Sequence, residues 1–174
     1  IKQHKRSIIL IGNFDGLHLG HQKLFRLAKN FKKKYSLNIG VLTFEPMPKM
    51  FINNKLSNIR ISNQKQKINT LKKHNVDFVI IKKFDKKFSK IKSTNFIKNI
   101  LVSKLQAKFV FVSNNFRFGN RREGDVKQLI KYEKIFNYKI VKPKPLSKNK
   151  KIISSSLIRN LLMKGKIKKA NEFL

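Results

Sequence analysis

A short segment near the start of the chain, residues 11–25 (IGNFDGLHLGHQKLF), concentrates residue types that bind anions. It contains three of the seven glycines and two of the four histidines of the chain. His18 and His21 are three positions apart at the start of a predicted helix, so both imidazoles can face the same side of that helix. The amides and dipole at a helix start attract negative charge, and imidazoles can donate to phosphate oxygens. The segment predicts a phosphate site that stabilises charge on a phosphorus atom under attack.

Spacing alone leaves two other interpretations of the histidine pair open. The two residues can be ordinary polar loop residues, or zinc ligands whose third partner lies elsewhere in a chain without cysteine. The segment is neither G-x-G-x-x-G nor a P-loop. Gly12, Gly16 and Gly20 are expected to let the backbone approach a ligand or adopt a positive φ.

Strands and helices are predicted to alternate around this segment. Strands are predicted at residues 7–14, 38–46, 76–84, 107–116 and 138–145, and helices at 20–35, 62–74, 93–105, 124–136 and 154–165. Ser93 is expected to be an N-cap, and Gly165 is expected to end the last helix. Residues 45–61 and 113–124 are expected to be long irregular loops. The order predicts an α/β fold, a Rossmann-like doubly wound five-stranded parallel sheet, with ligands at the carboxyl ends of its strands.

Length and composition indicate one domain with a substantial core. The chain has 174 residues, of which 40% are hydrophobic and 15 are phenylalanine. No uncharged apolar run approaches the roughly 18 residues of a membrane helix, so no membrane partner is expected. The absence of cysteine excludes disulfides and fits a cytoplasmic location.

The formal net charge of +34 has two interpretations. A basic surface can bind a polyanion such as nucleic acid, with an affinity that falls steeply with salt. However, lysines greatly outnumber arginines and are spread along the whole chain, which favours compositional drift over a selected surface. We therefore expect no specific nucleic-acid partner and keep a nucleic-acid-binding domain as the alternative from a different class.

Four patterns occur in this order: GNFDGLHLGH (12–21), LTFEPMP (42–48), VSNNFRFGNRREGD (112–125) and ISSSLIRNLLMKGKIKKANEFL (153–174). Together they resemble the HxGH nucleotidyltransferase superfamily in the form found in bacterial FAD synthetases. The resemblance identifies residues 1–174 as an FMN adenylyltransferase domain with the HxGH nucleotidyltransferase fold. It also implies a C-terminal riboflavin kinase domain in the parent protein, which this chain lacks.

The resemblance implies that the chain transfers AMP from ATP to FMN, giving FAD and pyrophosphate, without a covalent enzyme intermediate. Mg²⁺ is expected to be held mostly by the ATP phosphates, and no protein ligand for it is assigned. The catalytic residues implied are His18, His21 and Arg159. The implied ATP-binding residues are Gly12, Asn13, Phe14, Asp15, Gly20, His21, Ser154, Ser155 and Arg159. The implied FMN-binding residues are Phe44, Pro46, Asn115, Phe116, Arg117, Phe118 and Gly119.

Several of these residues also have a plainer interpretation. The serines at 154–156 can simply cap a helix, although with Arg159 one turn later they also form a plausible phosphate cradle. Phe116 and Phe118 can be core residues under a loop, and Glu45 can help to place Mg²⁺ or cap a loop.

The chain departs from the family pattern at three positions. Ser113 replaces a usual glycine and Met47 a usual polar residue, and both changes are expected to weaken flavin binding. Ser156 replaces threonine conservatively. A related HxGH enzyme with another phosphate acceptor, such as pantetheine phosphate, a nicotinamide nucleotide or a polyol phosphate, stays open. A decayed, inactive copy is disfavoured because the histidines, Asp15, the serines and Arg159 are all present.

Overall fold

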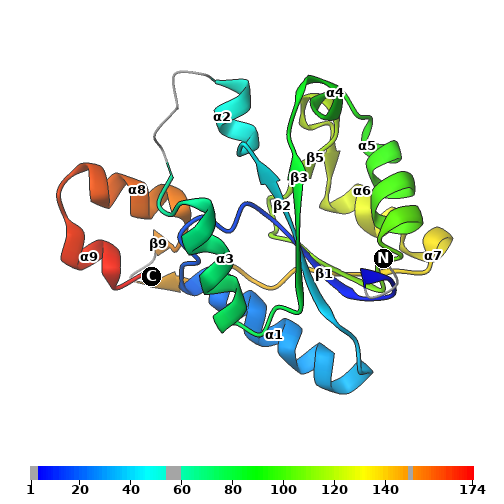
Figure 1. Cartoon of the computed structure of the whole chain (residues 1–174), viewed down its shortest axis with the longest axis horizontal. Helices are drawn as coiled ribbons and strands as arrows, with labels where there is room; N and C mark the ends of the chain where they lie inside the picture. The colour runs from blue at the N-terminus through cyan, green and yellow to red at the C-terminus, as the bar shows by residue number, and fades with distance from the viewer. Residues whose placement is uncertain (1–3, 54–59, 149–150) are drawn as a thin grey trace.

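Five parallel strands form the central sheet of the computed structural model, which describes residues 4–53, 60–148 and 151–174 (Figure 1). The strand order is β3-β2-β1-β4-β7. The strands are β1 (Ile8–Ile11), β2 (Ile39–Glu45), β3 (Phe78–Lys83), β4 (Phe109–Phe111) and β7 (Lys139–Val141). The chain order reverses between β1 and β4, which confirms the doubly wound α/β prediction and places the switch point beside β1.

Helices cover both faces of the sheet (Figure 1). Those before β4 are α1 (Leu19–Tyr35), α2 (Pro48–Ile52), α3 (Gln64–Lys73), α4 (Lys86–Ser89), α5 (Ser93–Asn95) and the π-helix η3 (Phe96–Lys104). Those after β4 are the 3₁₀ turn η4 (Asn120–Arg122), α6 (Val126–Lys131), α7 (Glu133–Phe136), α8 (Ser155–Met163) and α9 (Ile167–Asn171). In Figure 1, α1 and α3 lie on one side of the sheet and α5, α6 and α7 on the other.

The hydrophobic core is divided by the sheet because side chains alternate along a strand. Ile8 and Leu10 pack with α1 and α3, whereas Ile9 and Ile11 pack with η3 and α6. All four residues of β1 are buried, as expected for the central strand of a parallel sheet. This rigid strand positions the loop that follows it.

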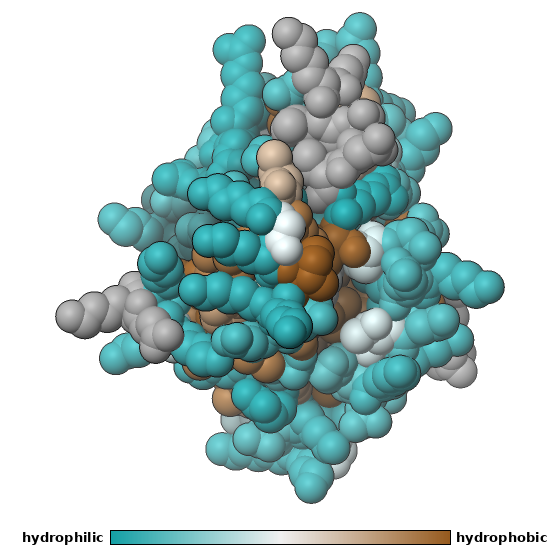
Figure 2. Space-filling view, turned by 90° about the vertical axis from the view of Figure 1, so that its left-hand side faces the viewer, coloured by the Kyte–Doolittle hydropathy of each residue, from teal (hydrophilic) through white to brown (hydrophobic). Residues whose placement is uncertain are grey.

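A third, smaller cluster joins the C-terminal helices to the start of α1. Ile158 of α8 and Phe173 pack together with Leu19, and the Leu19 N–H donates to the Phe173 carbonyl at 2.9 Å. Figure 2 shows that this side of the molecule is mainly hydrophilic around a small hydrophobic patch. Within the described part of the chain, none of the helices has the length and apolar character needed to cross a membrane.

Several predicted boundaries are corrected by the structure. The predicted strand 7–14 ends at Ile11, because the chain turns into a loop where Phe14 has a positive φ. The predicted helix 124–136 is broken at Tyr132 into α6 and α7. The predicted strand 138–145 pairs with β4 only over residues 139–141, because its partner β4 has only three residues.

The expected irregular loops contain secondary structure. Residues 45–61 include the helix α2, with Pro48 at its first position, and residues 54–59 lie outside the described part. Residues 113–124 include η4 and most of an antiparallel pair, β5 (Arg117–Phe118) with β6 (Gly124–Asp125). A second pair, β8 (Ser147–Lys148) with β9 (Lys151–Ile152), precedes α8.

Ser93 is not the N-cap that the sequence predicted. The N-cap is Lys92, and the Ser93 N–H donates instead to the Glu123 carboxylate at 2.6 Å. Ser93 is buried because the β5–β6 hairpin packs onto it: a Cβ at Gly119 or Gly124 would come within 2.8 Å of Ser93. A carboxylate that is distant in sequence therefore caps this helix, which local sequence could not reveal.

Candidate functional site

The predicted site residues come together at the carboxyl edge of the sheet. Because β1 pairs in parallel with both β2 and β4, the loops that follow these strands emerge side by side. These loops begin at Gly12, Pro46 and Val112, and the start of α8 packs against the first of them. All four motifs singled out in the sequence thus contribute to one edge of the molecule.

Asp15 links three separate segments of the chain. Its carboxylate is only 2% exposed and accepts hydrogen bonds from the N–H groups of Ile61 (3.0 Å) and Ser62 (3.1 Å). It also forms an ion pair with Arg159, 2.8 Å from the guanidinium. Charge-assisted hydrogen bonds of this kind are about twice as strong as neutral ones. Asp15 therefore holds the loop after β1, the segment before α3, and α8 together.

The same loop has an unusual backbone conformation. Phe14, Gly16 and Leu17 all have a positive φ, with values of 47°, 78° and 36°. Such a conformation costs a non-glycine residue on the order of 1–2 kcal/mol. The side chains of Phe14 and Leu17 are buried in the core, which offsets this cost. The ring of Phe14 is therefore a core group, which leaves only its backbone for the predicted ATP-binding role.

His18 is the N-cap of α1. Its Nδ1 accepts from the His21 N–H at 3.4 Å, so in the neutral ring the proton is on Nε2. Burial lowers the pKa of His18 to about 4, against the attraction of Asp15. At neutral pH His18 is thus an uncharged imidazole with one N–H available to a ligand.

His21 stacks on His18, with ring centroids 3.7 Å apart. Burial, followed by the neighbouring His18, lowers the pKa of His21 well below its usual range. Its Nδ1 is buried and has no hydrogen-bond partner among the described residues. Glycine at the third position of the HxGH spacing leaves room for the His18 ring, because a Cβ at Gly20 would lie 3.1 Å from that ring, a tight contact.

The start of α8 carries the predicted serines and Arg159. Ser154 is the N-cap and accepts from the Leu157 N–H at 3.2 Å, which confirms the capping interpretation for this serine. Ser155 donates to the Asp15 carbonyl at 3.0 Å. Arg159 follows one turn later and pairs with Asp15. Asp15 and α8 are therefore in direct contact, although 140 residues separate Asp15 from Ser155.

Most of the predicted FMN residues surround an aromatic cluster. Phe44, at the end of β2, lies 5.8 Å from Phe88 between ring centroids, and Phe116 stacks on Phe118 at 5.5 Å. Phe44 and Phe118 are buried, whereas Phe116 is half-buried. Asn115 is exposed and accepts from the Ser113 hydroxyl at 2.9 Å. Arg117 is exposed, 3.8 Å from Asp125.

Sequence reasoning missed several residues at this edge. Phe84 and Phe88 are half-buried members of the aromatic cluster, contributed by the segment after β3 and by α4. Their signal was an aromatic pair four positions apart that begins at the last residue of a predicted strand. Arg60 pairs with Glu45, and Lys67 is buried nearby. The signal for Arg60 was the rarity of arginine in this chain, but nothing local distinguished Lys67 from the other lysines.

Glu45 and Met47 take different positions at the end of β2. Glu45 pairs with Arg60 through Oε1, while its Oε2 is buried and has no partner among the described residues. Met47 is buried, so it acts as an apolar anchor at the start of α2 and does not project from the loop.

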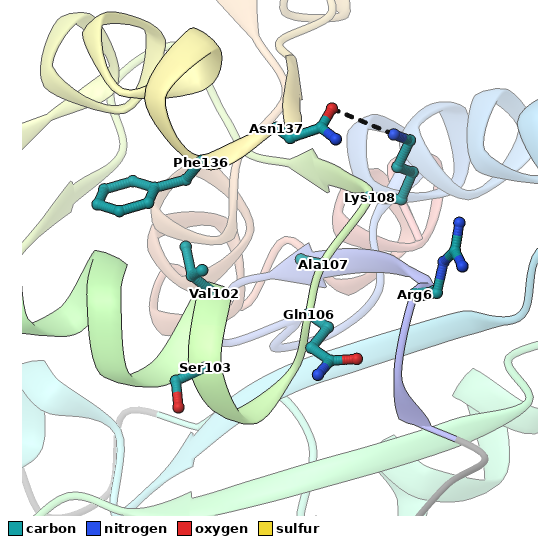
Figure 3. A pocket seen from close by; sticks show the side chains of 8 residues that line it. All are labelled: Arg6, Val102, Ser103, Gln106, Ala107, Lys108, Phe136 and Asn137. Carbon is teal, nitrogen blue, oxygen red and sulfur yellow. Dashed lines mark hydrogen bonds between the residues drawn. The ribbon is translucent and has the colours of Figure 1, made fainter.

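A hollow of about 500 Å³ lies at the opposite edge of the sheet (Figure 3). Its lining includes Arg6, Ala107, Lys108 and Asn137, which precede β1, β4 and β7, and Lys108 donates to Asn137 at 3.3 Å. None of the predicted site residues contributes to it, so this hollow is separate from the carboxyl edge.

Comparison with known proteins gives consistent matches to one family. The family model described as FAD synthetase matches residues 1–157. A bifunctional riboflavin kinase/FMN adenylyltransferase of Buchnera aphidicola subsp. Acyrthosiphon pisum is 39% identical over 171 residues, covering 98% of this chain and 55% of the relative. The protein of the same name from Escherichia coli K12 is 32% identical over 167 residues, covering 96% of this chain and 53% of the relative. The chain therefore spans about half the length of these relatives.

A solved structure shares the fold over nearly the whole chain. The macrolide-efflux protein of Streptococcus pneumoniae superposes with a TM-score of 0.85 at 26% identity, covering 97% of this chain and 56% of that one. This likeness supports the α/β architecture that the sequence predicted.

Proposed function

Because the chain belongs to the FAD synthetase family, we propose that it transfers AMP from ATP to FMN, releasing pyrophosphate. A phosphate oxygen of FMN attacks the α-phosphorus of ATP, and the bond from that phosphorus to the bridging oxygen of pyrophosphate breaks. Reactions of this type depend on positioning and charge stabilisation more than on covalent chemistry. The described residues are suited to those two tasks.

The observation that carries the proposal is the grouping of phosphate donors around the start of α1. His18 directs its Nδ1 to the helix, which leaves Nε2–H for a ligand. The Gly20 N–H makes no hydrogen bond within the described structure, at the positive end of the helix dipole. Arg159 adds a guanidinium held by Asp15. We refer to residues 12–21 with 154–159 as the phosphate side.

The aromatic cluster supports a flat acceptor such as the isoalloxazine ring of FMN. The rings of Phe44, Phe84, Phe88, Phe96, Phe116 and Phe118 form this cluster, in which Phe96 joins Phe88 to Phe118, and we call it the flavin side. Aromatic rings favour flat partners through stacked and edge contacts. The cluster follows β2, β3 and β4, next to the phosphate side, as transfer between two bound nucleotides requires.

Mg²⁺ belongs to the same proposal as a companion of ATP. No group of three His, Cys, Asp or Glu side chains in the described structure could hold a metal ion. The buried Glu45 Oε2 could contribute one ligand, and Mg²⁺ is usually bound by one or two carboxylates together with substrate phosphates and water. When bound, the ion would neutralise charge on the leaving pyrophosphate.

The relatives' names join FMN adenylyltransferase to riboflavin kinase, so we propose a riboflavin kinase domain as the partner that supplies FMN. The absence of cysteine supports a cytoplasmic location as part of this proposal.

The direct test is FAD formation by the purified chain with FMN, ATP and Mg²⁺, resolved by chromatography. We expect FAD from the parent chain and a loss of about 10²–10³-fold in kcat for His21→Ala, the effect typical of removing one charge-stabilising donor. His4→Ala is the matched control, because His4 precedes β1 at the other edge of the sheet. FAD formation by His21→Ala at the parent rate would contradict the assigned chemistry.

The acceptor is tested in the same assay. Pantetheine phosphate and nicotinamide mononucleotide are offered in place of FMN, with pyrophosphate release as the readout. Turnover with one of these and none with FMN would keep the nucleotidyl transfer but replace the acceptor.

A further inference from the structure

The side-chain amide of Gln22 joins two segments that are far apart in the sequence. Its Nε2 donates to the Leu17 carbonyl at 3.2 Å and to the main-chain oxygen of Leu174. An amide NH₂ carries two donor hydrogens, so it can make both bonds at once. Leu17 lies at the end of the loop after β1, whereas Leu174 lies 152 residues beyond Gln22. One half-buried side chain therefore links the phosphate side to the segment that follows α9.

The Leu17 carbonyl belongs to the peptide group that leads into His18, the proposed phosphate donor. Leu17 is buried and has a positive φ of 36°, in a loop outside any helix or strand. A buried carbonyl needs a hydrogen-bond partner. Gln22 is the fourth residue of α1, and helical side chains point back toward the helix N-terminus, which brings its amide to this carbonyl. The Gln22 side chain therefore fixes the peptide group before His18.

The orientation of His18 depends on its backbone. The bond from the His21 N–H to His18 Nδ1 is long at 3.4 Å, so on its own it holds the imidazole weakly. Shorter bonds are made by the His18 carbonyl, which accepts from the N–H groups of His21 at 2.7 Å and Gln22 at 3.0 Å. Gln22 thus restrains both peptide groups of His18, the one before it through the side chain and the one after it through the main chain.

The turn after α9 gives the Gln22 amide a fixed second anchor. The Phe173 carbonyl accepts from the Leu19 N–H at 2.9 Å, and the two side chains pack in the same small cluster. The Leu174 N–H donates to the Asn171 carbonyl at 3.2 Å. The main-chain oxygen that Gln22 reaches therefore belongs to a turn that is itself attached to the first turn of α1.

We propose that Gln22 is a positioning residue for adenylyl transfer, whose amide ties the peptide group before His18 to the turn after α9 and so keeps the His18 imidazole directed at the transferring phosphate. This inference rests on the proposed function, because the direction of that imidazole matters only if it meets a phosphate. An apolar side chain of the same length would serve packing equally well. Donation to two main-chain oxygens requires the amide.

The test compares Gln22→Met, which keeps the length of the side chain and removes both donors, with Lys23→Met. Lys23 is the matched control: its Nζ donates to the Lys144 carbonyl at 3.3 Å, so it also ties α1 to a distant segment, but not to the peptide group before His18. We expect Gln22→Met to lower kcat at least about tenfold while the KM values for ATP and FMN change less than about threefold, because misplacement by about 1 Å can cost 10²-fold in rate. Lys23→Met is expected to keep the parent kcat. Circular dichroism at the assay temperature checks that each variant is folded.

Two further variants separate positioning from a general structural role. Gln22→Arg restores N–H donors at this position and is expected to keep kcat within about threefold of the parent, because a guanidinium presents several N–H groups. In a His18→Asn background, Gln22→Met is expected to lower kcat less than about threefold, because residues that act together are coupled. A Gln22→Arg as slow as Gln22→Met, or an equal loss in both backgrounds, would overturn the inference. If Gln22→Met does not fold, Gln22→Leu takes its place under the same criteria.

The parent chain is assayed beside every variant. A parent chain that makes no FAD overturns the proposed function, and with it this inference. An active parent with a folded Gln22→Met that loses less than about tenfold in kcat, or no more than Lys23→Met loses, overturns the inference alone.

Discussion

The phosphate side and the flavin side lie next to each other at the same edge of the sheet but are held by different forces. On the phosphate side, single atoms define the geometry: Asp15 accepts from two backbone amides and from Arg159, and His18 caps α1. On the flavin side, rings pack at centroid distances of 5.2–6.4 Å with few polar contacts. Directed hydrogen bonds fix orientation, whereas ring packing mainly fixes volume.

This difference predicts different tolerance to substitution. The phosphate side should lose activity when a single polar atom is removed, because a buried partner is then left uncompensated. The flavin side should tolerate changes of shape at a moderate cost in affinity. The following predictions test this contrast, from the largest expected effect to the smallest.

Replacement of Arg159 should have the largest effect. Arg159→Ala leaves the 2%-exposed Asp15 carboxylate without its cation, so we expect a loss of about 3 kcal/mol in the free energy of unfolding. We also expect kcat to fall about 10²–10³-fold, because a charge-stabilising donor is lost. Urea unfolding and FAD formation measure the two effects, with the exposed Arg26→Ala on α1 as control. Equal kcat values for the two variants would place Arg159 outside the reaction.

The free energy of unfolding should depend on pH through the buried His18. The pKa of His18 is about 4 in the folded protein and about 6.5 in the unfolded chain, so the unfolded chain binds this proton first as the pH falls. Stability is therefore complete above pH 6.5 and decreases toward pH 4, by about 3 kcal/mol for this group.

Urea unfolding between pH 7 and pH 4 measures this slope. His18→Asn keeps a side-chain oxygen that can cap α1 and removes the titrating ring. We expect a shallower slope for this variant, and an identical slope would show that the acid sensitivity arises elsewhere.

A conservative change on the flavin side should affect one substrate only. Phe88→Leu removes a ring that lies 5.6–6.4 Å from Phe84, Phe44 and Phe96. We expect the KM for FMN to rise about tenfold, equivalent to about 1.4 kcal/mol, with the KM for ATP unchanged. Phe136→Leu is the matched control, because Phe136 lines the hollow at the other edge. An equal rise for both substrates would contradict the separation of the two sides.

Added salt should have the smallest effect, and it acts on the whole molecule. The formal charge of +34 destabilises the compact state through self-repulsion, which salt screens. Between about 20 and 300 mM NaCl we expect Tm to rise by about 2–4 °C, or about 1 kcal/mol at this size. Differential scanning calorimetry measures this shift. A flat or falling Tm would show that repulsion among the lysines does not destabilise the folded state.

The sequence predicted elements well where the signal was local and periodic. The apolar pattern of residues 20–35 gave α1, and Ser154 gave the start of α8, because helix faces and caps depend on residues a few positions apart. Prediction failed where distant contacts decided the outcome. Ser93 was expected to cap the helix with its side chain, but its own N–H is instead bonded by the carboxylate of Glu123, 30 residues away.

Sequence alone predicted which residues bind a nucleotide: the glycines and histidines of residues 12–21, and the serines followed by Arg159. The roles within that set were decided only by tertiary structure. Folding buried Phe14 in the core and made Asp15 a link between segments. The physical reason is that motif chemistry is carried by neighbours in the chain, whereas burial and charge balance depend on residues that meet only when the sheet assembles.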